Sequence, residues 1–472
     1  MRKHQYLFFV AFAGITTLYS SNQAFAEEQP SVTVPPIKAF DQDAEQYAKD
    51  YKVLYSEALR RLIIQNSSGE IIKQLEGEFK NRLAGVYFEH EPTYKLVVVL
   101  TGNSPISNRN AALKNHTTAA FAGSLALPIE FKVGAKFNRS QLIRMIDENH
   151  NNLKLAFPNI QAVSINEKDG TLDVELYEPN GENSIGRSQK IALRSSDKPS
   201  SLSNIPLTVQ TTNILLQPSA AVRASESMLM AENATSTTYY KCTTGFNIKD
   251  ATGKKYSTTA AHCKNAKITV DDRKTTANDQ ISLTFVKEFW NGSQDFQVMS
   301  LASTSHTLNP EFFAGDNVVK TLTGRRSRAS TNAVDQGVQG DYVCHYGVTT
   351  GYSCGTVQSK TFKPYGTANK CGSAATSVCN PTWVKVSGPT LDCWGGDSGG
   401  PVFIGNVAVG LLSVATYKWP IAGTNPIQYY SWNASTMKGK GWCGGTAQPN
   451  GYMAYMSTDE LYNQGYSLLY GQ

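Results

Sequence analysis

All eight cysteines of this 472-residue chain lie at or after Cys242, and the first half of the chain has none. An even number of cysteines confined to one region indicates disulfides formed in an oxidising compartment. Zinc is the alternative, but no Cys-x-x-Cys pair occurs and only three histidines share the region. We therefore expect no metal and no cofactor. Because 472 residues are too many for one ordinary hydrophobic core, the chain should divide into a cysteine-free part and a cross-linked part.

The composition is that of a globular protein of modest charge, with 40% hydrophobic and 17% charged residues. The net charge of +6 is spread along the chain. Its densest basic run, Arg325-Arg326-Ser327-Arg328, is short and has no interleaved aromatic residues. Such a run favours a solvated loop over a nucleic-acid site, so we expect no nucleic-acid partner.

The N-terminus has the three parts of a secretory signal peptide. Basic residues at positions 2–4 precede an apolar stretch from Tyr6 to Ile15, and Ala24-Phe25-Ala26 follows. Residues 1–26 are therefore predicted to be removed. No other run reaches the ~18 apolar residues that a membrane span needs. We expect a secreted product with no membrane partner after signal removal, exported through the periplasm if the source is Gram-negative.

The cysteine-free part has the pattern of an α+β unit. Apolar residues between 36 and 84 recur at helical spacing, and Ser67 with Glu70 is predicted to form a capping box. This region is followed by extended segments at 85–89 and 96–101, a helix around 142–146 and a hairpin over 162–176. This part contains no catalytic constellation. The next stretch, Ser195–Thr238, is rich in Ser, Thr, Ala and Asn, which predicts a linker or processing junction.

The stretch with the clearest chemistry is Gly395-Gly396-Asp397-Ser398-Gly399-Gly400-Pro401. A serine among glycines on a tight turn exposes its hydroxyl and leaves backbone N–H groups nearby. That suits a nucleophile with donors for the oxyanion that its attack creates. Upstream, Thr259-Ala260-Ala261-His262-Cys263 supplies a candidate general base.

An aspartate that orients the imidazole must be buried. Asp295 begins a strand-like alternation 33 residues after His262. Asp279 has a similar context but follows His262 by only 17 residues, which is short for a chain that must complete a hairpin. We therefore favour Asp295 and keep Asp279 as the alternative. The order His, Asp, Ser is one of three in which this triad recurs.

Together these stretches resemble the chymotrypsin-like serine proteases. The closer likeness is to the alpha-lytic protease and streptogrisin branch, because the segment from Cys344 to Val357, CHYGVTTGYSCGTV, is similar to a disulfide-closed hairpin of that branch. Those proteases usually carry a basic residue after the first cysteine, where it pairs with the aspartate before the nucleophile. Here the position is His345, so the partner of Asp397 stays an open question.

The resemblance implies an all-β fold, a double six-stranded antiparallel β-barrel (chymotrypsin-like protease domain) preceded by an α+β pro-region. It covers the chain from Cys242 to the end, with insertions near 361–381 and 416–440. Residues 83–102 also resemble the pro-region of alpha-lytic protease, which in that family is a folding catalyst and inhibitor. The implied domains are 27–225 and 226–472, with the mature start between 223 and 235. The alternative is an accessory domain that stays attached.

The resemblance also implies roles for the site residues. Ser398 would be the nucleophile, His262 the general base and acid, and Asp295 the orienting carboxylate. The N–H groups of Gly396 and Ser398 would form the oxyanion hole. A strand containing Ser413, Val414 and Ala415 would pair with an extended peptide substrate.

Four disulfides are expected. Three of them follow the family resemblance, and the fourth pairs the two remaining cysteines inside an insertion. The pairs are Cys242–Cys263, Cys344–Cys354, Cys393–Cys443 and, for the remaining two, Cys371–Cys379.

Two alignments disagree about specificity. Counting back six residues from Ser398 reaches Asp392, where trypsin-like enzymes hold the carboxylate that binds Lys or Arg. Anchoring on Cys393 puts Leu391 at that place instead. An unpaired buried carboxylate is costly, and related bacterial proteases mostly prefer apolar side chains. We favour an apolar or medium-sized residue before the cleaved bond and keep a basic residue as the alternative.

The expected function is that of a secreted serine endopeptidase, made as a self-processing preproprotein, which hydrolyses peptide bonds through an acyl-enzyme. Its partners would be protein or peptide substrates and its own pro-region, and we expect a monomer. The alternative is a catalytically inactive, protease-like binding module. An esterase with a similar serine is a third interpretation, which we disfavour.

Overall fold

The computed structural model describes most of the chain from residue 37 onward. The described residues are 37–113, 125–177, 190–192, 202, 204–212, 215–218, 226–271, 280–304, 306–328, 337–364, 371, 378–417, 443 and 451–471. The predicted signal peptide, Asp279 and most of the two predicted insertions lie outside these residues.

The N-terminal part begins with a short 3-10 turn, Ile37–Phe40, and three helices, followed by a four-stranded sheet of order β1-β2-β4-β3. β1 and β2 pair antiparallel, as the extended segments predicted, whereas β2 and β4 are parallel. The elements are α1 (Asp41–Tyr51), α2 (Tyr55–Ser67), α3 (Gly69–Glu78), β1 (Leu83–Glu89), β2 (Lys95–Thr101), β3 (Arg109–Ala112) and β4 (Ala126–Ala135).

The predicted capping box at Ser67 is wrong. Ser67 is the last residue of α2, and its hydroxyl donates to the carbonyl of Ile63 in the same helix. The N-cap of α3 is Ser68, which makes no side-chain cap hydrogen bond. A capping box does form further along the chain, where Asn138 and Gln141 bond reciprocally at the start of α4 (Arg139–Ala156).

Four further strands of the N-terminal part extend a sheet of the protease part. β5 (Ile160–Asn166) and β6 (Thr171–Tyr177) form the predicted antiparallel hairpin, and α4 packs on it through one apolar cluster. β6 pairs parallel with β8 (Leu207–Thr212), which pairs with β7 (Lys190–Ala192). β5 also pairs with β21 (Gly351–Pro364), so the two halves of the chain share one continuous sheet.

The first barrel is built from an antiparallel sheet of order β11-β10-β14-β15-β16-β13-β12-β26. Its core contains buried apolar residues such as Met228, Ile268 and Met299. Its strands are β10 (Ser227–Ala231), β11 (Tyr239–Thr243), β12 (Ile248–Lys249), β13 (Lys255–Thr259), β14 (Ala266–Asp271), β15 (Gln280–Asn291), β16 (Gln294–Leu301) and β26 (Ser467–Leu468).

The second barrel is a closed ring of six antiparallel strands in the order β20-β23-β24-β25-β22-β21, completed by the pairing of β20 with β21. The other five strands are β20 (Tyr342–Gly347), β22 (Trp383–Ser387), β23 (Pro401–Ile404), β24 (Val407–Tyr417) and β25 (Met453–Ser457). Shorter elements flank it: β17 (Glu311–Phe313), β18 (Val319–Thr321), β19 (Gly324–Arg325) and α6 (Asp459–Tyr462).

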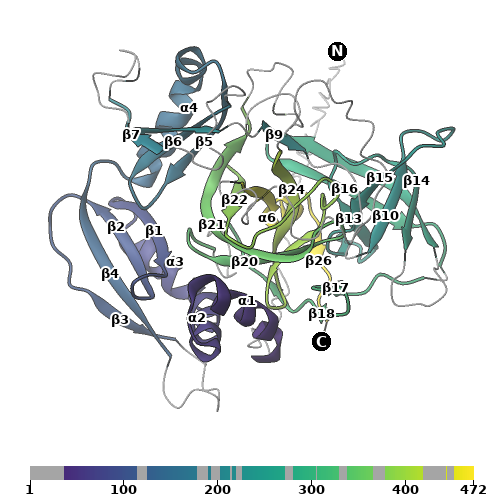
Figure 1. Cartoon of the computed structure of the whole chain (residues 1–472), viewed down its shortest axis with the longest axis horizontal. Coiled ribbons are helices and arrows are strands. Elements are labelled where there is room, and N and C mark those ends of the chain that lie inside the picture. The colour runs from purple at the N-terminus through teal and green to yellow at the C-terminus, as the bar shows by residue number, and fades with distance from the viewer. Residues whose placement is uncertain are drawn as a thin grey trace, which may run out of the picture.

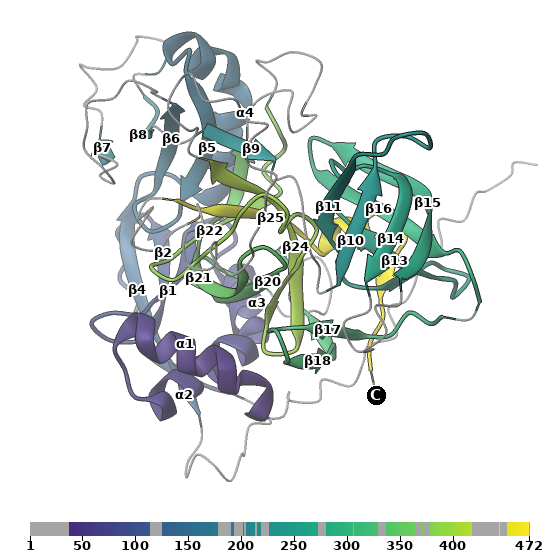
Figure 2. The same ribbon diagram turned by 45° about the vertical axis from the view of Figure 1, so that its right-hand side comes forward.

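The fold class predicted from the sequence, a chymotrypsin-like double barrel after an α+β segment, is confirmed. The first barrel differs from the expected six strands because short β12 and β26 extend its edge. The N-terminal elements lie against the second barrel, on the side away from the first (Figures 1 and 2). Helices α1–α3 and the second barrel share one buried apolar cluster, which includes Phe40, Leu62 and Phe403.

Candidate active site

Ser398 lies on a tight loop between β22 and β23. The glycines on both sides have positive φ angles, +113° at Gly396 and +85° at Gly399, in a region that favours glycine. A Cβ on Gly399 would also clash with Thr259 and with the backbone of Thr243. The glycine-rich sequence is therefore what allows this turn to bring the serine so close to the first barrel.

Hydrogen bonds fix this loop to both barrels. The amide of Thr243 in β11 donates to the carbonyl of Ser398 at 2.8 Å, and its hydroxyl donates to the carbonyl of Gly396 at 2.8 Å. On the other side, the amide of Gly399 donates to the carbonyl of Leu412 in β24 at 2.7 Å. The position of Ser398 is thus determined by the contact between the two barrels.

Three side chains predicted from the sequence form one hydrogen-bonded series. Nε2 of His262 lies 2.8 Å from Oγ of Ser398, and Nδ1 lies 2.7 Å from Oδ2 of Asp295. The backbone amide of His262 donates to Oδ1 of the same aspartate at 3.0 Å. His262 follows β13 and Asp295 is in β16, so the first barrel supplies these two and the second supplies the serine.

Asp295 is buried, yet it stays acidic. Burial raises the pKa of its carboxyl, but the charge of His262 and hydrogen bonds from His262 and Ser413 outweigh burial, so the pKa of Asp295 lies below its ordinary value. The hydroxyl of Ser413, in β24, donates to Oδ2 at 2.5 Å. An ionised carboxylate therefore faces Nδ1 of His262, which favours the tautomer with its proton on Nδ1 and its lone pair towards Ser398.

Asp397, the residue before the serine, is fully buried and is held by neutral donors. Its carboxylate accepts from the amides of Trp394 (2.8 Å), Thr349 (2.9 Å) and Thr350 (3.3 Å) and from the hydroxyl of Thr350 (2.7 Å). Burial raises the pKa of Asp397 to about 6. The carboxylate thereby ties the serine loop to the turn between β20 and β21.

His345 does not take the role of a cation beside Asp397. Its Nε2 lies 2.6 Å from the carbonyl oxygen of Asp392 and 2.9 Å from the hydroxyl of Ser353. Burial lowers the pKa of His345 to about 4, so the ring is neutral at physiological pH. A neutral histidine fits at this position because its Nε2 bonds to the carbonyl oxygen of Asp392 and so supports the backbone there.

The residues predicted to contact substrate lie in two segments, one in β24 and one in the loop before the serine turn. Ser413, Val414 and Ala415 are buried in β24, next to Asp295. Asp392 is partly buried, and its amide donates to the hydroxyl of Ser353 at 2.8 Å, while the neighbouring Leu391 is fully buried. The backbone at 391–392 is therefore well ordered by side chains of β20 and β21.

The structure has the four disulfides named from the sequence, and among the described residues no cysteine is free. Cys242–Cys263 links β11 to the residue after His262, and Cys344–Cys354 joins β20 to β21 below the turn that holds Asp397. Cys393–Cys443 anchors the start of the serine loop, and Cys371–Cys379 closes a short loop beyond β21. Each cross-link is of a kind that persists in oxidising compartments.

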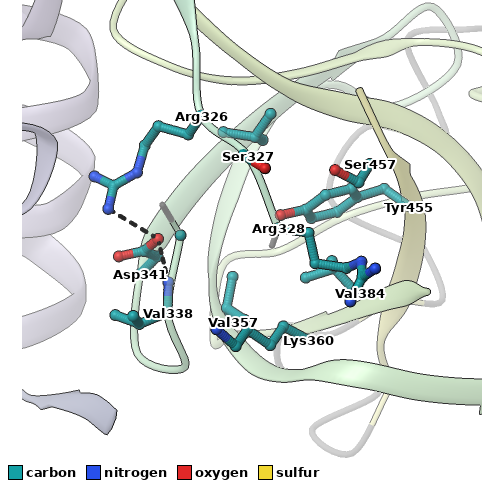
Figure 3. Close-up of a pocket in the computed structure, with 12 residues that line it drawn as sticks. Arg326, Ser327, Arg328, Val338, Asp341, Val357, Lys360, Val384, Tyr455 and Ser457 are labelled. Atoms are coloured by element: carbon teal, nitrogen blue, oxygen red, sulfur yellow. Dashed lines mark hydrogen bonds and ion pairs between the residues drawn. The ribbon is translucent and has the colours of Figure 1, made fainter. Parts of the chain in front are cut away.

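A separate pocket, lined by both charged and apolar residues, lies at strands β21, β22, β24 and β25 of the second barrel (Figure 3). Arg326 and Asp341 form an ion pair there, with 3.5 Å between Nη2 and Oδ2, and Arg326 also donates to the carbonyl of Gln65 in α2. None of the residues around Ser398 lines this pocket. This pocket is therefore separate from the candidate active site.

Sequence reasoning missed the donors that hold Asp397. Thr349 and Thr350 stand in the hairpin segment that carried the family resemblance, so the signal was present but was not connected with Asp397. It also missed Trp290, whose ring lies 6.2 Å from that of His262. Trp290 pairs with Asp295 across β15 and β16, a register that the sequence alone does not define.

Two antiparallel barrels, with this serine, histidine and aspartate where they meet, define the chymotrypsin-like protease fold. Residues 229–445 match the model of the trypsin family. Residues 229–445 are therefore a trypsin-family domain, that of a serine protease.

The chain is also similar, at low sequence identity, to several solved protease structures. Thermobifida fusca protease A is 19% identical, with a TM-score of 0.34, and the match covers 53% of this chain and all of that one. Nocardiopsis protease is 20% identical, with a TM-score of 0.32, and the match covers 52% of this chain and 97% of that one. An alpha-lytic protease homolog, N4, is 19% identical, with a TM-score of 0.33, and the match covers 53% of this chain and 100% of that one. No curated protein matches the chain by sequence.

Within the described ranges, no helix is long and apolar enough to cross a membrane.

Proposed function

We propose that the protein is a secreted serine endopeptidase that hydrolyses peptide bonds through an acyl-enzyme. The observation that carries this proposal is the continuous series of short hydrogen bonds from Asp295 through His262 to Ser398. A serine bonded to an imidazole that is itself oriented by a buried carboxylate has the parts needed for nucleophilic catalysis at neutral pH.

In the proposed mechanism, Nε2 of His262 takes the proton of Ser398 as Oγ attacks the carbonyl carbon of the substrate. Asp295 stabilises the imidazolium that forms. The amides of Gly396 and Ser398 stabilise the oxyanion. His262 then protonates the departing amine, leaving an ester on Ser398, and a water molecule activated by the same imidazole hydrolyses that ester.

We further propose that residues 27–225 are a pro-region and residues 226–472 the protease. The proposal is supported by the apolar cluster that α1–α3 share with the second barrel and by the pairing of β5 with β21. The signal-like sequence at residues 1–26 and the four disulfides support secretion. An N-terminal domain that remained attached to the active enzyme would contradict the pro-region.

The test is a Ser398→Ala variant, compared with Ser303→Ala at an exposed serine of the same domain. Both are treated with a fluorophosphonate probe and assayed on casein. We expect Ser303→Ala to be labelled and active, and Ser398→Ala to be unlabelled, with its rate reduced by about 10⁶-fold because the three residues act as a unit. A wild-type protein that neither reacts with the probe nor hydrolyses casein would instead be the inactive binding module.

A further inference from the structure

The hairpin that carries Asp295 places this carboxylate close to its turn. β15 and β16 belong to the first barrel, and their last residue pair, Asn291 with Gln294, encloses the two-residue turn Gly292–Ser293. Asp295 forms the next pair, with Trp290. Because neighbouring pairs of an antiparallel ladder are joined through the same two backbones, the position of the turn determines where the carboxylate lies.

The turn is bound by the second barrel through three hydrogen bonds. The carbonyl oxygen of Gly292 accepts from the backbone amide of Asn380 at 2.8 Å and from Nε1 of Trp383 at 3.2 Å. The side-chain amide of Asn380 donates to the hydroxyl of Ser293 at 2.6 Å. Both residues of the turn are therefore held by the second barrel, although the hairpin itself comes from the first.

The two donor residues are themselves fixed. Trp383 lies in β22 and is 1% exposed, so its indole cannot turn away without opening the core of the second barrel. Asn380 has an exposed side chain but follows the buried Cys379. The amide of Cys379 donates to the carbonyl of Pro364, the last residue of β21, at 2.9 Å, and its sulfur is bonded to Cys371. The second barrel thus presents both donors from a fixed frame.

The backbone of Asp295 faces the same barrel. Its amide donates to Sδ of Met456 in β25 at 3.4 Å. Because a thioether is a weak acceptor, this contact holds the strand less firmly than the hydrogen bonds at the turn. We therefore expect the turn contacts to determine the position of this end of the hairpin.

We propose that Asn380 and Trp383 are positioning residues for the protease reaction, which act on Asp295 through the turn between β15 and β16. This inference rests on the proposed function. In the proposed mechanism, Asp295 stabilises the imidazolium that forms when His262 takes the serine proton. A displaced hairpin weakens that stabilisation, which is needed only in the chemical step. The loss should therefore fall on kcat and leave KM unchanged.

The test compares wild type with Asn380→Ala, Trp383→Phe and Thr284→Ala, all produced as full-length chains. kcat and KM are measured on the peptide nitroanilide that the wild type cleaves fastest, and active enzyme is counted by complete labelling with a fluorophosphonate probe. From the contribution of a single hydrogen bond, we expect kcat to fall about two- to twelvefold in the first two variants, with KM within about twofold. Thr284→Ala, at an exposed position of β15 away from the turn, should match wild type.

A double variant separates positioning from a general loss of stability. The side chain of Asn380 acts on the turn through Ser293, so Asn380→Ala should lower kcat no further in a chain that already carries Ser293→Ala. Independent, multiplicative effects of the two changes would refute this route. Because Asn380 is exposed, its truncation tests the turn even if the core change at Trp383 prevents folding.

The count of labelled serines keeps failure of this inference apart from failure of the proposed function. An unchanged kcat per labelled serine in Asn380→Ala or Trp383→Phe, or a change in KM alone, would overturn the assignment of that residue and leave the proposed function standing. A wild type that is not labelled and hydrolyses neither the nitroanilides nor casein would show that the proposed function itself is wrong.

Discussion

At the scale of single residues, two buried groups near the serine loop respond to pH in opposite directions. His345 has its pKa lowered by burial from 6.5 to about 4, and Asp397 has its pKa raised by burial from 3.8 to about 6. Between pH 6.5 and 4 the unfolded His345 binds a proton that the folded one lacks, so stability falls as the pH falls. Between pH 6 and 3.8 the folded Asp397 binds the extra proton, so stability rises as the pH falls. The two effects partly cancel.

Replacing the histidine should therefore remove the loss of stability that protonation of His345 in the unfolded chain causes at low pH. In a Ser398→Ala background that prevents self-digestion, His345→Gln should become more stable relative to its parent as the pH falls from 6.5 to 4. The difference should reach about 3 kcal/mol at most, from the shift in the pKa of His345. Thermal unfolding across this range measures it, and His306→Gln, at a partly exposed position, is the control. Parallel curves for His345→Gln and its parent would contradict the prediction.

Asp392 carries the prediction on specificity. Its backbone is held by Ser353 and His345, while the adjacent Leu391 is buried. We expect peptide nitroanilides that end in Leu, Ala or another apolar or medium-sized residue to be cleaved faster than one that ends in Arg, and Asp392→Asn to change this order by less than about threefold. A dominant rate on Arg or Lys that disappears in Asp392→Asn would identify Asp392 as the carboxylate that binds a basic side chain.

At the scale of elements, α2 of the N-terminal part completes the hydrogen bonding of β20. The side-chain amide of Gln65 donates to the carbonyl of Tyr342 at 3.1 Å, and its carbonyl oxygen accepts from the amide of Tyr342 at 2.7 Å. Gln65 is 1% exposed, so water cannot replace it while the helix is in place. The helix thereby holds the start of the hairpin whose turn fixes Asp397.

Gln65→Ala should weaken this contact. Leaving a buried backbone pair without partners costs about 1–3 kcal/mol, which corresponds to roughly 5- to 150-fold in affinity. The yield of active protease should fall when the variant N-terminal segment is supplied as a separate chain. Ser56→Ala, at an exposed position of the same helix, should leave the yield unchanged. Equal yields from the two variants would show that α2 does not assist the hairpin.

At the scale of the whole molecule, the N-terminal part contacts the second barrel through buried polar groups as well as apolar ones. Asp43 accepts from the hydroxyl of Tyr352 at 2.7 Å and from the amide of Gly405 at 2.6 Å. Glu175 pairs with Lys385 at 2.8 Å. These contacts lie on β21, on β22 and on the turn between β23 and β24, in the barrel whose closure depends on non-local pairing.

Non-local strand pairing folds slowly, because the entropy of closing long loops is lost before contacts form. We therefore expect the denatured protease half, residues 226–472, to refold poorly alone and to recover activity when residues 27–225 are added as a separate chain. We expect a high unfolding barrier to maintain the native state that is reached in this way. The recovered rate on casein, with and without the added segment, measures the effect. Efficient unaided refolding would reject a folding role for the N-terminal part.

The sequence alone determined the features whose physical cause is local. The turn around Ser398 needs adjacent glycines, the hairpin at 162–176 needs alternation around a turn, and the cysteines lie in one half. Each of these is a property of residues close together in the chain, so spacing and residue type were enough. The pairing of Asp295 with His262 was also predicted, because a strand that begins with an acid stood at a suitable distance.

Tertiary structure decided the contacts between distant segments. Thr349 holds Asp397 across 48 residues, and Gln65 bonds Tyr342 across 277. The placement of β9 (Leu215–Pro218) on β24 depends on a register that no local pattern contains. Such contacts arise when strands and helices from separate parts of the chain bury their apolar faces together, and only then do their polar groups find the partners that burial requires.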